Sequence, residues 1–302
     1  MMQLTILGCH SATPRENKHT TSQLLEVMGH LFLIDCGEGT QMQLRKAKIK
    51  FSRIQHIFIS HLHGDHFYGL IGLISTFRLL GRTAPLHIYG PQGIQEIIQL
   101  QLKLAKSWTD YPLHFHELSG TTPELLFDED QVKVETIPLD HRVYTNGFLF
   151  TLNGTLRKIN KQAAEKYTLS PFHFNQLQKG LSITLDTGEI ISNDALTFDP
   201  PPPKRYAYCS DTAYSESITD QIYGVDLLYH EATFLEQHED LAHNTKHSTA
   251  KQAALVAHNA KAKKLVLGHF SSRYSNKELF LHEASSVFEG VELAEDFKTF
   301  SI

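Results

Sequence analysis

The sequence predicts an α/β protein in which helices pack in layers against β-sheets. Short apolar or β-branched runs alternate with amphipathic segments in both the first and the last third of the chain. The length of 302 residues is enough to bury a sizeable core. With 41% hydrophobic and 20% charged residues, the composition is that of an ordinary globular chain, which excludes disordered, collagen-like and coiled-coil proteins.

The first part of the chain alternates strands and helices. Apolar runs, several of them β-branched, predict strands at 3–8, 22–27, 30–35, 54–60, 85–90, 113–118 and 132–139. Two amphipathic segments predict helices at 40–49 and 69–80. Pro91 is expected to open a third helix that continues to about Lys106, because proline fits the first turn of a helix.

The last third repeats this organisation around an inserted segment. Strands are predicted at 204–210, 225–232 and 263–268, with helices that start at Ser248 or Thr249 and at about Asn276. Residues about 151–202 show no clear core pattern, are basic, and end in four prolines at 200–203. We therefore predict a single domain over 1–302 that carries an inserted arm at about 151–202.

Charge and cysteine content restrict the function classes. The formal net charge of −5 excludes a chain that binds nucleic acid over its whole surface, but residues 41–53 and 151–180 are locally basic. Cys9, Cys36 and Cys209 are odd in number and far apart, which favours a reducing compartment over a disulfide framework. Without a signal-like N-terminus or a long apolar run, we expect a cytoplasmic protein with no membrane contact.

The segment SHLHGDHFYGL, at 60–70, places four potential metal ligands directly after an apolar strand. His61 and His63 are two residues apart, so in an extended segment both project to the same side and can bind one ion. Asp65 and His66 point elsewhere, which suits a second ion nearby. The chain has 19 histidines against 18 glycines, in keeping with metal or acid/base chemistry. The motif predicts a two-metal centre.

Three single polar residues that end other strands are candidates for the missing ligands. They are His141, Asp211 and His269. The strand ends of an α/β sheet are where such folds present their active sites, and an aspartate can bridge two cations, a role we assign to Asp211. Taken alone, each residue is as compatible with a helix cap or a core polar group as with a metal ligand. His87, His114 and His116 lie inside strands and are interpreted as structural.

A further cluster, at 230–258, suggests an acid/base pair. His247 immediately precedes the expected helix start, where an imidazole and free backbone N–H groups face an anion together. Glu231 follows an apolar strand and is placed to orient that imidazole, as carboxylates do for histidine tautomers. The alternative is a helix N-cap with surface histidines nearby.

These motifs, in this order, resemble the ribonuclease Z family, tRNA 3′-processing endonucleases of the metallo-β-lactamase superfamily. The resemblance extends from LTILGCHSATP (4–14) and DCGEGTQ (35–41), through the motifs above, to HEATF (230–234), HSTAKQAA (247–254) and GHFSSRY (268–274). It implies a four-layered αββα sandwich with two zinc ions per subunit. One ion would be held by His61, His63, His141 and Asp211, and the other by Asp65, His66, Asp211 and His269.

The resemblance also implies roles in the reaction. Asp65 would handle a proton, and Glu231 with His247 would lie beside the scissile phosphate. Enzymes of this family are typically homodimers in which the arm of one subunit holds the tRNA that the other cuts. The family's N-terminal loop pattern, Pro-x-Lys-x-Arg-Asn, is reduced here to Pro14 and a basic group at Lys18.

We therefore expect a zinc-dependent phosphodiesterase, an endoribonuclease that removes the 3′ trailer of precursor tRNA and leaves a 3′-hydroxyl. Phosphate contacts are expected from Lys18 and Arg273 and from the arm residues Lys158, Lys161 and Lys166. One alternative is a dizinc hydrolase of small phosphate or sulfate esters or cyclic nucleotides, because fold does not fix substrate. Another is a protein that binds RNA or stores metal without catalysis.

Overall fold

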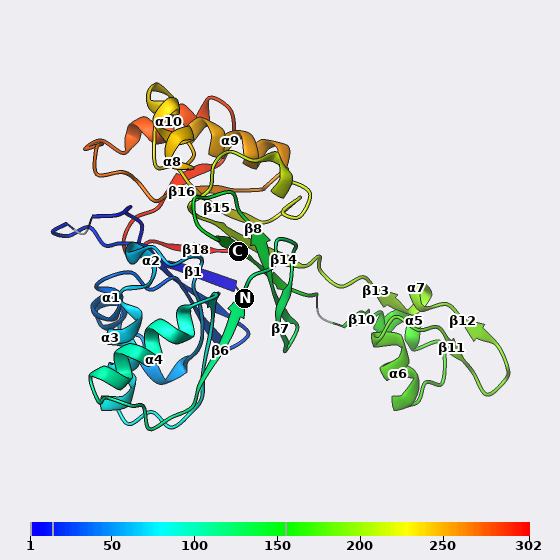
Figure 1. Cartoon of the computed structure of the whole chain (residues 1–302). Helices are drawn as coiled ribbons and strands as arrows, with labels where there is room; N and C mark the ends of the chain where they lie inside the picture. Colours follow the sequence, from blue (N-terminus) through cyan, green and yellow to red (C-terminus); the bar gives the residue numbers. More distant parts are fainter. Residues whose placement is uncertain (1, 14, 155) are drawn as a thin grey trace. The chain divides into compact units, whose positions relative to one another are not determined.

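Two β-sheets face each other in the larger part of the chain (Figure 1). The computed structural model describes residues 2–13, 15–154 and 156–302, so Pro14 lies outside the described residues. Within them, the first sheet has the order β18 (Thr299–Ser301), β1 (Met2–Gly8), β2 (Ser22–Val27), β3 (His30–Ile34), β4 (Ile54–Phe58), β5 (Leu86–Pro91) and β6 (Leu113–Leu118). The second has the order β17 (Val291–Leu293), β16 (Leu265–Gly268), β15 (Leu227–Glu231), β14 (Lys204–Cys209), β9 (Asn146–Leu152), β8 (Val132–Pro138) and β7 (Leu125–Glu129).

Helices cover the outer faces of both sheets (Figure 1). On the first sheet they are α1 (Thr40–Lys46), the short α2 (Gly64–Phe67), α3 (Leu70–Leu79) and α4 (Ile94–Leu104). On the second they are α8 (Glu239–Thr245), α9 (Ala250–Asn259) and α10 (Glu278–Ser285). Short 3₁₀ turns lie at Phe51–Arg53, Glu216–Ile218 and Glu236–His238. These layers confirm the predicted α/β sandwich.

Two parts of the core lie on opposite sides of the first sheet. Leu33 of β3 and Ile57 of β4 pack with the helices, in a cluster that includes Phe77 of α3. The opposite face of the same strands is aromatic and meets the second sheet. There, Phe58 lies 5.3 Å from Phe148 of β9, measured between ring centroids in an edge-to-face arrangement. The strict alternation of the strand side chains between two apolar layers fixes the register.

Parallel strands bring the ends of distant segments together. Strands β14, β15 and β16 are parallel and in register, with Cys209 opposite His230 and Glu231 opposite Gly268. Asp211 follows β14 and His269 follows β16, so both lie at the same sheet edge as Glu231. Strand β4 runs parallel to β3 and β5 in the other sheet, and the histidine motif follows it.

Most predicted elements are confirmed, but one boundary is wrong. Pro91 belongs to β5 and does not open the following helix. The ladder with β6 continues past it, because Gln92 N donates to Leu118 O at 3.1 Å. Helix α4 begins only at Ile94, after Gly93 with φ of 100°, and Glu117 Oε1 accepts from Gly93 N at 2.8 Å. Strands β7, β9, β17 and β18 were not predicted.

Residues Leu152–Lys204 form a second compact unit, which we call the arm, and its range is close to the expected insertion. Its elements are β10 (Lys158–Ile159) paired with β13 (Thr197–Phe198), β11 (Ile183–Thr184) paired with β12 (Ile190–Ile191), α5 (Lys161–Ala164), α6 (Pro171–Gln178) and α7 (Asn193–Leu196).

The arm has a small hydrophobic core although its sequence shows no clear core pattern. Leu177, Ile183 and Leu196 are buried in a small hydrophobic cluster of the arm's own. The buried Asn193 ties this cluster to the backbone, since its Nδ2 donates to Leu177 O at 2.8 Å and to Leu181 O at 2.9 Å. The residues of this cluster are too far apart in the sequence to show the hydrophobic periodicity of a helix or a strand.

No helix in the described part of the chain is both long and apolar enough to cross a bilayer.

Candidate metal centre

The turn that follows β4 carries the histidine motif. The strand ends at Phe58, and the backbone N–H of Ser60 is fixed by Asp35 Oδ1 at 2.7 Å. His63 then stands at the N-cap of α2, a one-turn helix in which Asp65 and His66 lie. This change from strand to helix within a few residues separates the four candidate ligands into two pairs.

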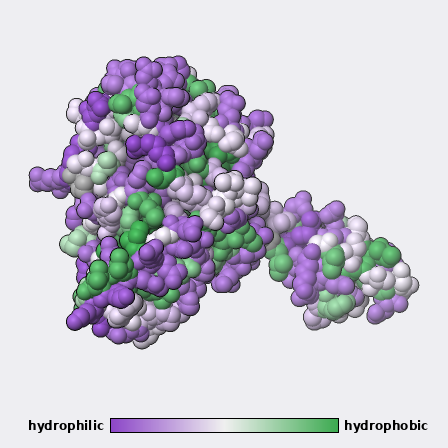
Figure 2. Space-filling view, viewed as in Figure 1, coloured by the Kyte–Doolittle hydropathy of each residue, from purple (hydrophilic) through white to green (hydrophobic). Residues whose placement is uncertain are grey.

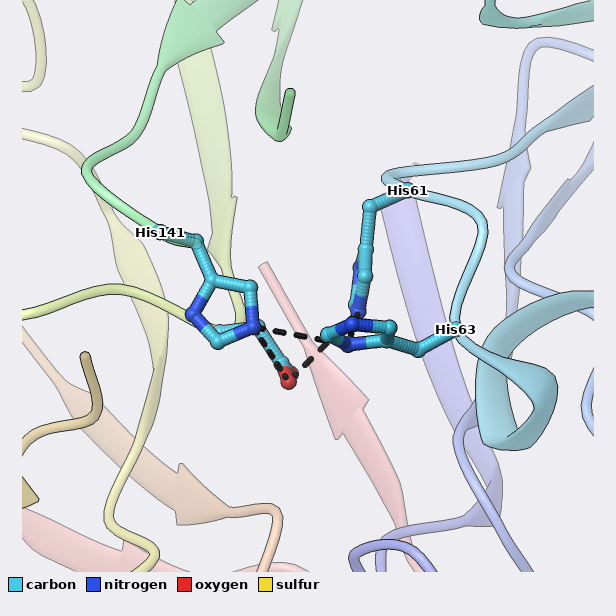
Figure 3. Close-up of side chains that lie close together, drawn as sticks. His61, His63 and His141 are labelled. Atoms are coloured by element: carbon cyan, nitrogen blue, oxygen red, sulfur yellow. Dashed lines mark hydrogen bonds and ion pairs between the residues drawn. The ribbon is translucent and has the colours of Figure 1, made fainter. Parts of the chain in front are cut away.

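The first donor group brings three imidazoles and one carboxylate together: His61, His63, His141 and Asp211. His61 Nε2 lies 3.0 Å from His63 Nδ1, and His141 Nε2 lies 3.4 Å from the same atom. Figure 3 shows the three rings converging, two from the turn after β4 and His141 from the loop after β8. Asp211 Oδ2 lies 3.6 Å from His61 Nε2.

The second donor group contains Asp65, His66 and His269. His66 Nε2 lies 3.3 Å from His269 Nε2, and Asp65 Oδ2 lies 3.4 Å from the same His269 atom. The other oxygen of Asp211, Oδ1, lies 3.1 Å from His66 Nε2 and 3.2 Å from His269 Nε2. One carboxylate of Asp211 therefore faces both donor groups, each with a different oxygen.

Protein acceptors fix the outer nitrogen of four of these rings. The pairs are His61 Nδ1 with Ser60 Oγ at 3.0 Å, His66 Nδ1 with Asp35 Oδ2 at 2.7 Å, His141 Nδ1 with Lys246 O at 2.8 Å, and His269 Nδ1 with Thr233 Oγ1 at 2.8 Å. Ser60 Oγ itself donates to Asp35, and Thr233 Oγ1 donates to Glu231, so each accepts from its histidine.

These outer hydrogen bonds test whether the residues fit a metal. In the neutral form each ring carries its proton on Nδ1, so Nε2 has a free lone pair. Those lone pairs point at one another and at the Asp211 carboxylate, an arrangement that only a proton or a cation between them relieves. Outer hydrogen bonds of this kind are typical of metal-binding histidines. The donor set therefore fits a metal centre.

Buried charges polarise the same cluster. Burial raises the pKa of Asp211, but the neighbouring histidines outweigh burial and hold this pKa well below its ordinary value. His269 has the largest effect among these histidines. Burial lowers the pKa of His61, which favours its neutral, ligating form. For His66, burial lowers the pKa, but the carboxylates of Asp211, Asp65 and Asp35 outweigh it and raise the pKa well above its ordinary value. The carboxylates around His66 thus favour positive charge at its position.

Three strand ends at the centre adopt left-handed backbone conformations. The φ angles are 56° for Asp35, 59° for Asp211 and 58° for His269. Such residues cost about 1–3 kcal/mol each and persist only where the surrounding structure enforces them. Here Asp211 and His269 face each other among the metal donors, and Asp35 holds the Nδ1 of His66.

Glu231 and His247 form a hydrogen-bonded pair beside the metal donors. His247 Nδ1 lies 2.7 Å from Glu231 Oε1, and Glu231 is fully buried. Glu231 also accepts from the backbone N of Thr212 at 2.8 Å and from Thr233 Oγ1 at 2.5 Å. Burial lowers the pKa of His247, but Glu231 and Asp211 outweigh it and raise the pKa to about 9. His247 is therefore an imidazolium at neutral pH.

The geometry leaves a second role open for His247. It also forms a group of possible ligands with Asp211 and His269, and its Nδ1 lies 4.0 Å from Asp211 Oδ2. The 2.7 Å contact with Glu231 is much the shorter, so the pairing with Glu231 is the one the geometry favours. Thr249, two residues on, is the N-cap of α9 and accepts from Gln252 N, as the helix prediction requires.

The other predicted contact residues lie on exposed segments. Arg273 is exposed in the loop after β16, and Lys18 is half-buried in the loop between β1 and β2. Lys158, Lys161 and Lys166 are exposed on the arm. Their contact with RNA stays a prediction.

The histidines interpreted as structural lie in register across β5 and β6. His87 stands opposite His114, and its Nδ1 lies 3.1 Å from Nε2 of His116. His56 of β4 stacks on His87 with ring centroids 5.1 Å apart. They belong to none of the groups of three or more possible ligands found among the described residues.

Comparison with known proteins decides the family. A ribonuclease Z from Bacteroides thetaiotaomicron is 46% identical over 294 residues, which cover 97% of this chain and 93% of that protein. One from Cytophaga hutchinsonii is 46% identical over 301 residues, with 99% and 96% covered. The chain belongs to the ribonuclease Z family. This membership confirms the predicted family and enzyme class, a metal-dependent endoribonuclease.

Further similarities agree with the ribonuclease Z assignment. The crystal structure of the short form of human tRNase Z has a TM-score of 0.73 and 30% identity, with 99% of each chain covered. The metallo-β-lactamase fold protein YhfI from Bacillus subtilis has a TM-score of 0.71 at 18% identity over the full length of both chains, which shows the fold alone. The family model of the anti-Pycsar protein Apyc1 matches residues 2–156.

Several residues that build this ribonuclease Z centre were not predicted. They are Asp35, Ser60, Thr233 and the backbone carbonyl of Lys246, which hold the outer nitrogens of the histidines. Asp35 ends a predicted strand and opens DCGEGTQ, so its position after an apolar run is a usable signal. The carbonyl of Lys246 has none, because a backbone acceptor leaves no trace in the sequence.

Proposed function

We propose that this chain is a tRNA 3′-processing endoribonuclease that removes the 3′ trailer of precursor tRNA, leaves a 3′-hydroxyl, and uses two zinc ions per chain. The single observation that carries this proposal is the Asp211 carboxylate, which presents one oxygen to each donor group beside the Glu231–His247 pair. Membership of the ribonuclease Z family supports the substrate. The two donor groups support the number of ions.

The donor chemistry suits zinc. His61, His63, His141 and Asp211 offer three nitrogens and one oxygen, and Asp65, His66, His269 and Asp211 offer two of each. Mixed imidazole and carboxylate sets of four are typical of zinc, although manganese and iron accept similar ligands. When bound, paired cations supply a Lewis acid for the phosphate oxygens and lower the pKa of water toward neutrality.

Asp65 is placed to accept a proton from the attacking water. Its Oδ2 is held by the backbone N–H of Ala12 at 2.7 Å. Although burial raises the pKa of Asp65, His66 and His269 hold it well below its ordinary value, so the group is a carboxylate at neutral pH. An oriented, ionised carboxylate is the form that a proton acceptor needs.

His247 is placed to protonate the leaving ribose 3′-oxygen. Glu231 keeps the imidazole charged and fixes its Nδ1, so that Nε2 carries the transferable proton. Glu231 is buried and acts through His247, which makes it a positioning residue.

The direct test combines cleavage-site mapping with metal analysis. Zinc-loaded protein is expected to cut one 3′-extended precursor tRNA at the end of the acceptor stem, leaving a 3′-hydroxyl. The variant His247→Ala is expected to lose about 10²- to 10⁴-fold in turnover, the range for a lost general acid, while metal content stays near two per chain. Loss of metal in that variant would instead make His247 a ligand.

A second candidate function is hydrolysis of small phosphodiesters, including cyclic nucleotides. The match of residues 2–156 to the Apyc1 family model favours it, because that range contains five of the candidate ligands but only the first few residues of the arm. A comparison at equal enzyme concentration separates the two. Turnover of a small chromogenic phosphodiester without cleavage of precursor tRNA would favour this second function.

RNA is held, in this proposal, by phosphate contacts from Arg273, Lys18 and the arm lysines. Affinity should then fall steeply as salt rises, because each neutralised phosphate releases counterions. Replacement of Lys158, Lys161 and Lys166 by glutamate should weaken binding of precursor tRNA strongly. Binding that is insensitive to salt or to this triple replacement would contradict the role of the arm.

A homodimer completes the proposal. Helices α3 and α4 expose large apolar side chains, with 85% of Leu79 and 74% of Leu104 accessible, and Figure 2 shows hydrophobic residues gathered over these helices. Exposed apolar clusters of this kind mark association surfaces. The test of the homodimer is to compare the sedimentation of Leu79→Asp with that of the unaltered protein.

The three free, buried cysteines support a cytoplasmic location.

A further inference from the structure

The arm contains a cavity of about 510 Å³. Its walls include the rings of Tyr167 and Phe174 and the side chain of Leu169, with Lys161, Glu165 and Gln178 among the polar groups that line it. This volume lies within the range of pockets that bind small organic groups. Figure 2 shows hydrophobic residues at the surface of the arm among hydrophilic ones.

The walls of this cavity are held in place by the arm's own structure. Tyr167 and Leu169 are half-buried and pack against the cluster around the fully buried Leu177. Helix α6, which carries Phe174, begins with a capping box in which Ser170 Oγ accepts from His173 N. The cavity is therefore a surface feature above a small core and not a gap within it.

Phe172 and Phe174 lie on the same helix but in different environments. Phe172 is 67% exposed and does not line the cavity, whereas Phe174 is half-buried and does. An exposed phenylalanine two residues away from the cavity wall provides an internal control for experiments on Phe174.

Charge on the arm is divided between its elements. Lys158, Lys161 and Lys166 are exposed on or beside β10 and α5, the elements next to the cavity, where Glu165 is the acid that lines it. The acids Asp194 and Asp199, on the α7 to β13 side, are paired with Arg157. The cavity side of the arm therefore attracts a polyanion, while an apolar peptide would gain nothing from these lysines.

We propose that this cavity holds one unpaired nucleobase of the bound precursor tRNA. The base stacks on Phe174 and Tyr167, the amide of Gln178 meets its edge, and Lys161 lies at its phosphate. Aromatic rings beside lysines are what unstacked bases of RNA require. This inference rests on the proposed function, because the nucleotide belongs to that substrate.

The test uses the full-length, zinc-loaded protein and one precursor tRNA. Phe174→Ala and Phe174→Leu are expected to raise the dissociation constant about five- to a hundredfold, the range for a lost stacked base. Phe174→Tyr is expected to stay within about threefold of the unaltered protein, because the ring is retained. The control Phe172→Ala is expected to change nothing. If Phe174→Leu binds like Phe172→Ala, the inference is overturned.

A second measurement does not depend on the stability of the alanine variant. The sole tryptophan, Trp108, is replaced by phenylalanine, and Phe174→Trp places a fluorophore in the cavity. Stacking with a base should quench its fluorescence at saturating precursor tRNA. Unchanged fluorescence on saturation would overturn the inference. Failure of the unaltered protein to bind or cleave precursor tRNA would instead overturn the proposed function, so the two failures are distinguishable.

Discussion

Replacement of Glu231 by glutamine tests the pairing with His247. Glutamine keeps the size of the side chain but removes the charge that raises the pKa of His247 to about 9 against the opposing effect of burial. Asp211 contributes less because its Oδ2 lies 4.0 Å from His247 Nδ1, whereas Glu231 Oε1 lies 2.7 Å from it. In Glu231→Gln the pKa of His247 should fall toward the ordinary value of about 6.5.

The magnitude follows from the protonated fraction of His247. Near pH 7.5, a group of pKa about 9 is about 97% protonated, and one of pKa 6.5 is about 9% protonated. Since a general acid acts in its protonated form, the rate should fall about tenfold near pH 7.5. Activity falls as pH rises through the pKa of His247. The alkaline limb of the pH–rate profile should therefore lie at lower pH in Glu231→Gln than in the unaltered protein.

The assay is single-turnover cleavage of precursor tRNA between about pH 6 and 9, with metal content measured in parallel. Glu231 accepts from Thr212 N and Thr233 Oγ1, and a buried amide satisfies these donors less well, so a loss of about 1–3 kcal/mol of stability accompanies the change. The matched control is His243→Gln, an exposed histidine of α8. An alkaline limb that stays in place in Glu231→Gln would refute the pairing.

Three further changes have defined outcomes. Asp211→Asn is expected to reduce bound metal to below one per chain by elemental analysis, since that carboxylate faces both donor groups, and retention of two would contradict it. Burial lowers the pKa of His56 to about 4 in the folded protein. Between about pH 6.5 and 4 the unfolded chain therefore binds a proton at His56 that the folded protein does not bind, so the free energy of unfolding falls as pH falls through this range. His56→Phe, which removes the unpartnered Nδ1, should therefore raise the melting temperature more at pH 5 than at pH 8, and an equal gain would count against it. Asn193→Ala removes the hydrogen bonds to Leu177 O and Leu181 O, so the arm should lose about 2 kcal/mol by hydrogen exchange while other amides keep their protection.

The candidate ligands could be predicted from the sequence because they follow strands. His61, His141, Asp211 and His269 each stand after an apolar run. The parallel strands β14 and β16 bring Asp211 and His269 to one edge of the second sheet, and His61 follows β4 of the first sheet. The structure brings all of them together. Their roles as ligands stay a prediction, and their convergence depends on how the two sheets pair strands that are distant in the sequence.

Features that depend on partners distant in the sequence could not be predicted. The residues around Pro91 favour the start of a helix, but the hydrogen-bond ladder between β5 and β6 extends past Pro91. Strand β9 was missed because it is apolar on both faces and has no alternation. The sequence of the arm shows no clear core pattern because Leu177, Ile183 and Leu196 come from three separate short elements. Long-range contacts, not local propensity, decide each of these cases.

The arm is connected to the rest of the chain at a point where its length can vary. The arm leaves at the end of β9 and returns at the start of β14, and these two strands are neighbours in the second sheet. A plain reverse turn would join them equally well, since insertions between adjacent strands leave the ladder intact. A change in the length of the arm would therefore leave the strands that lead to the candidate ligands in place.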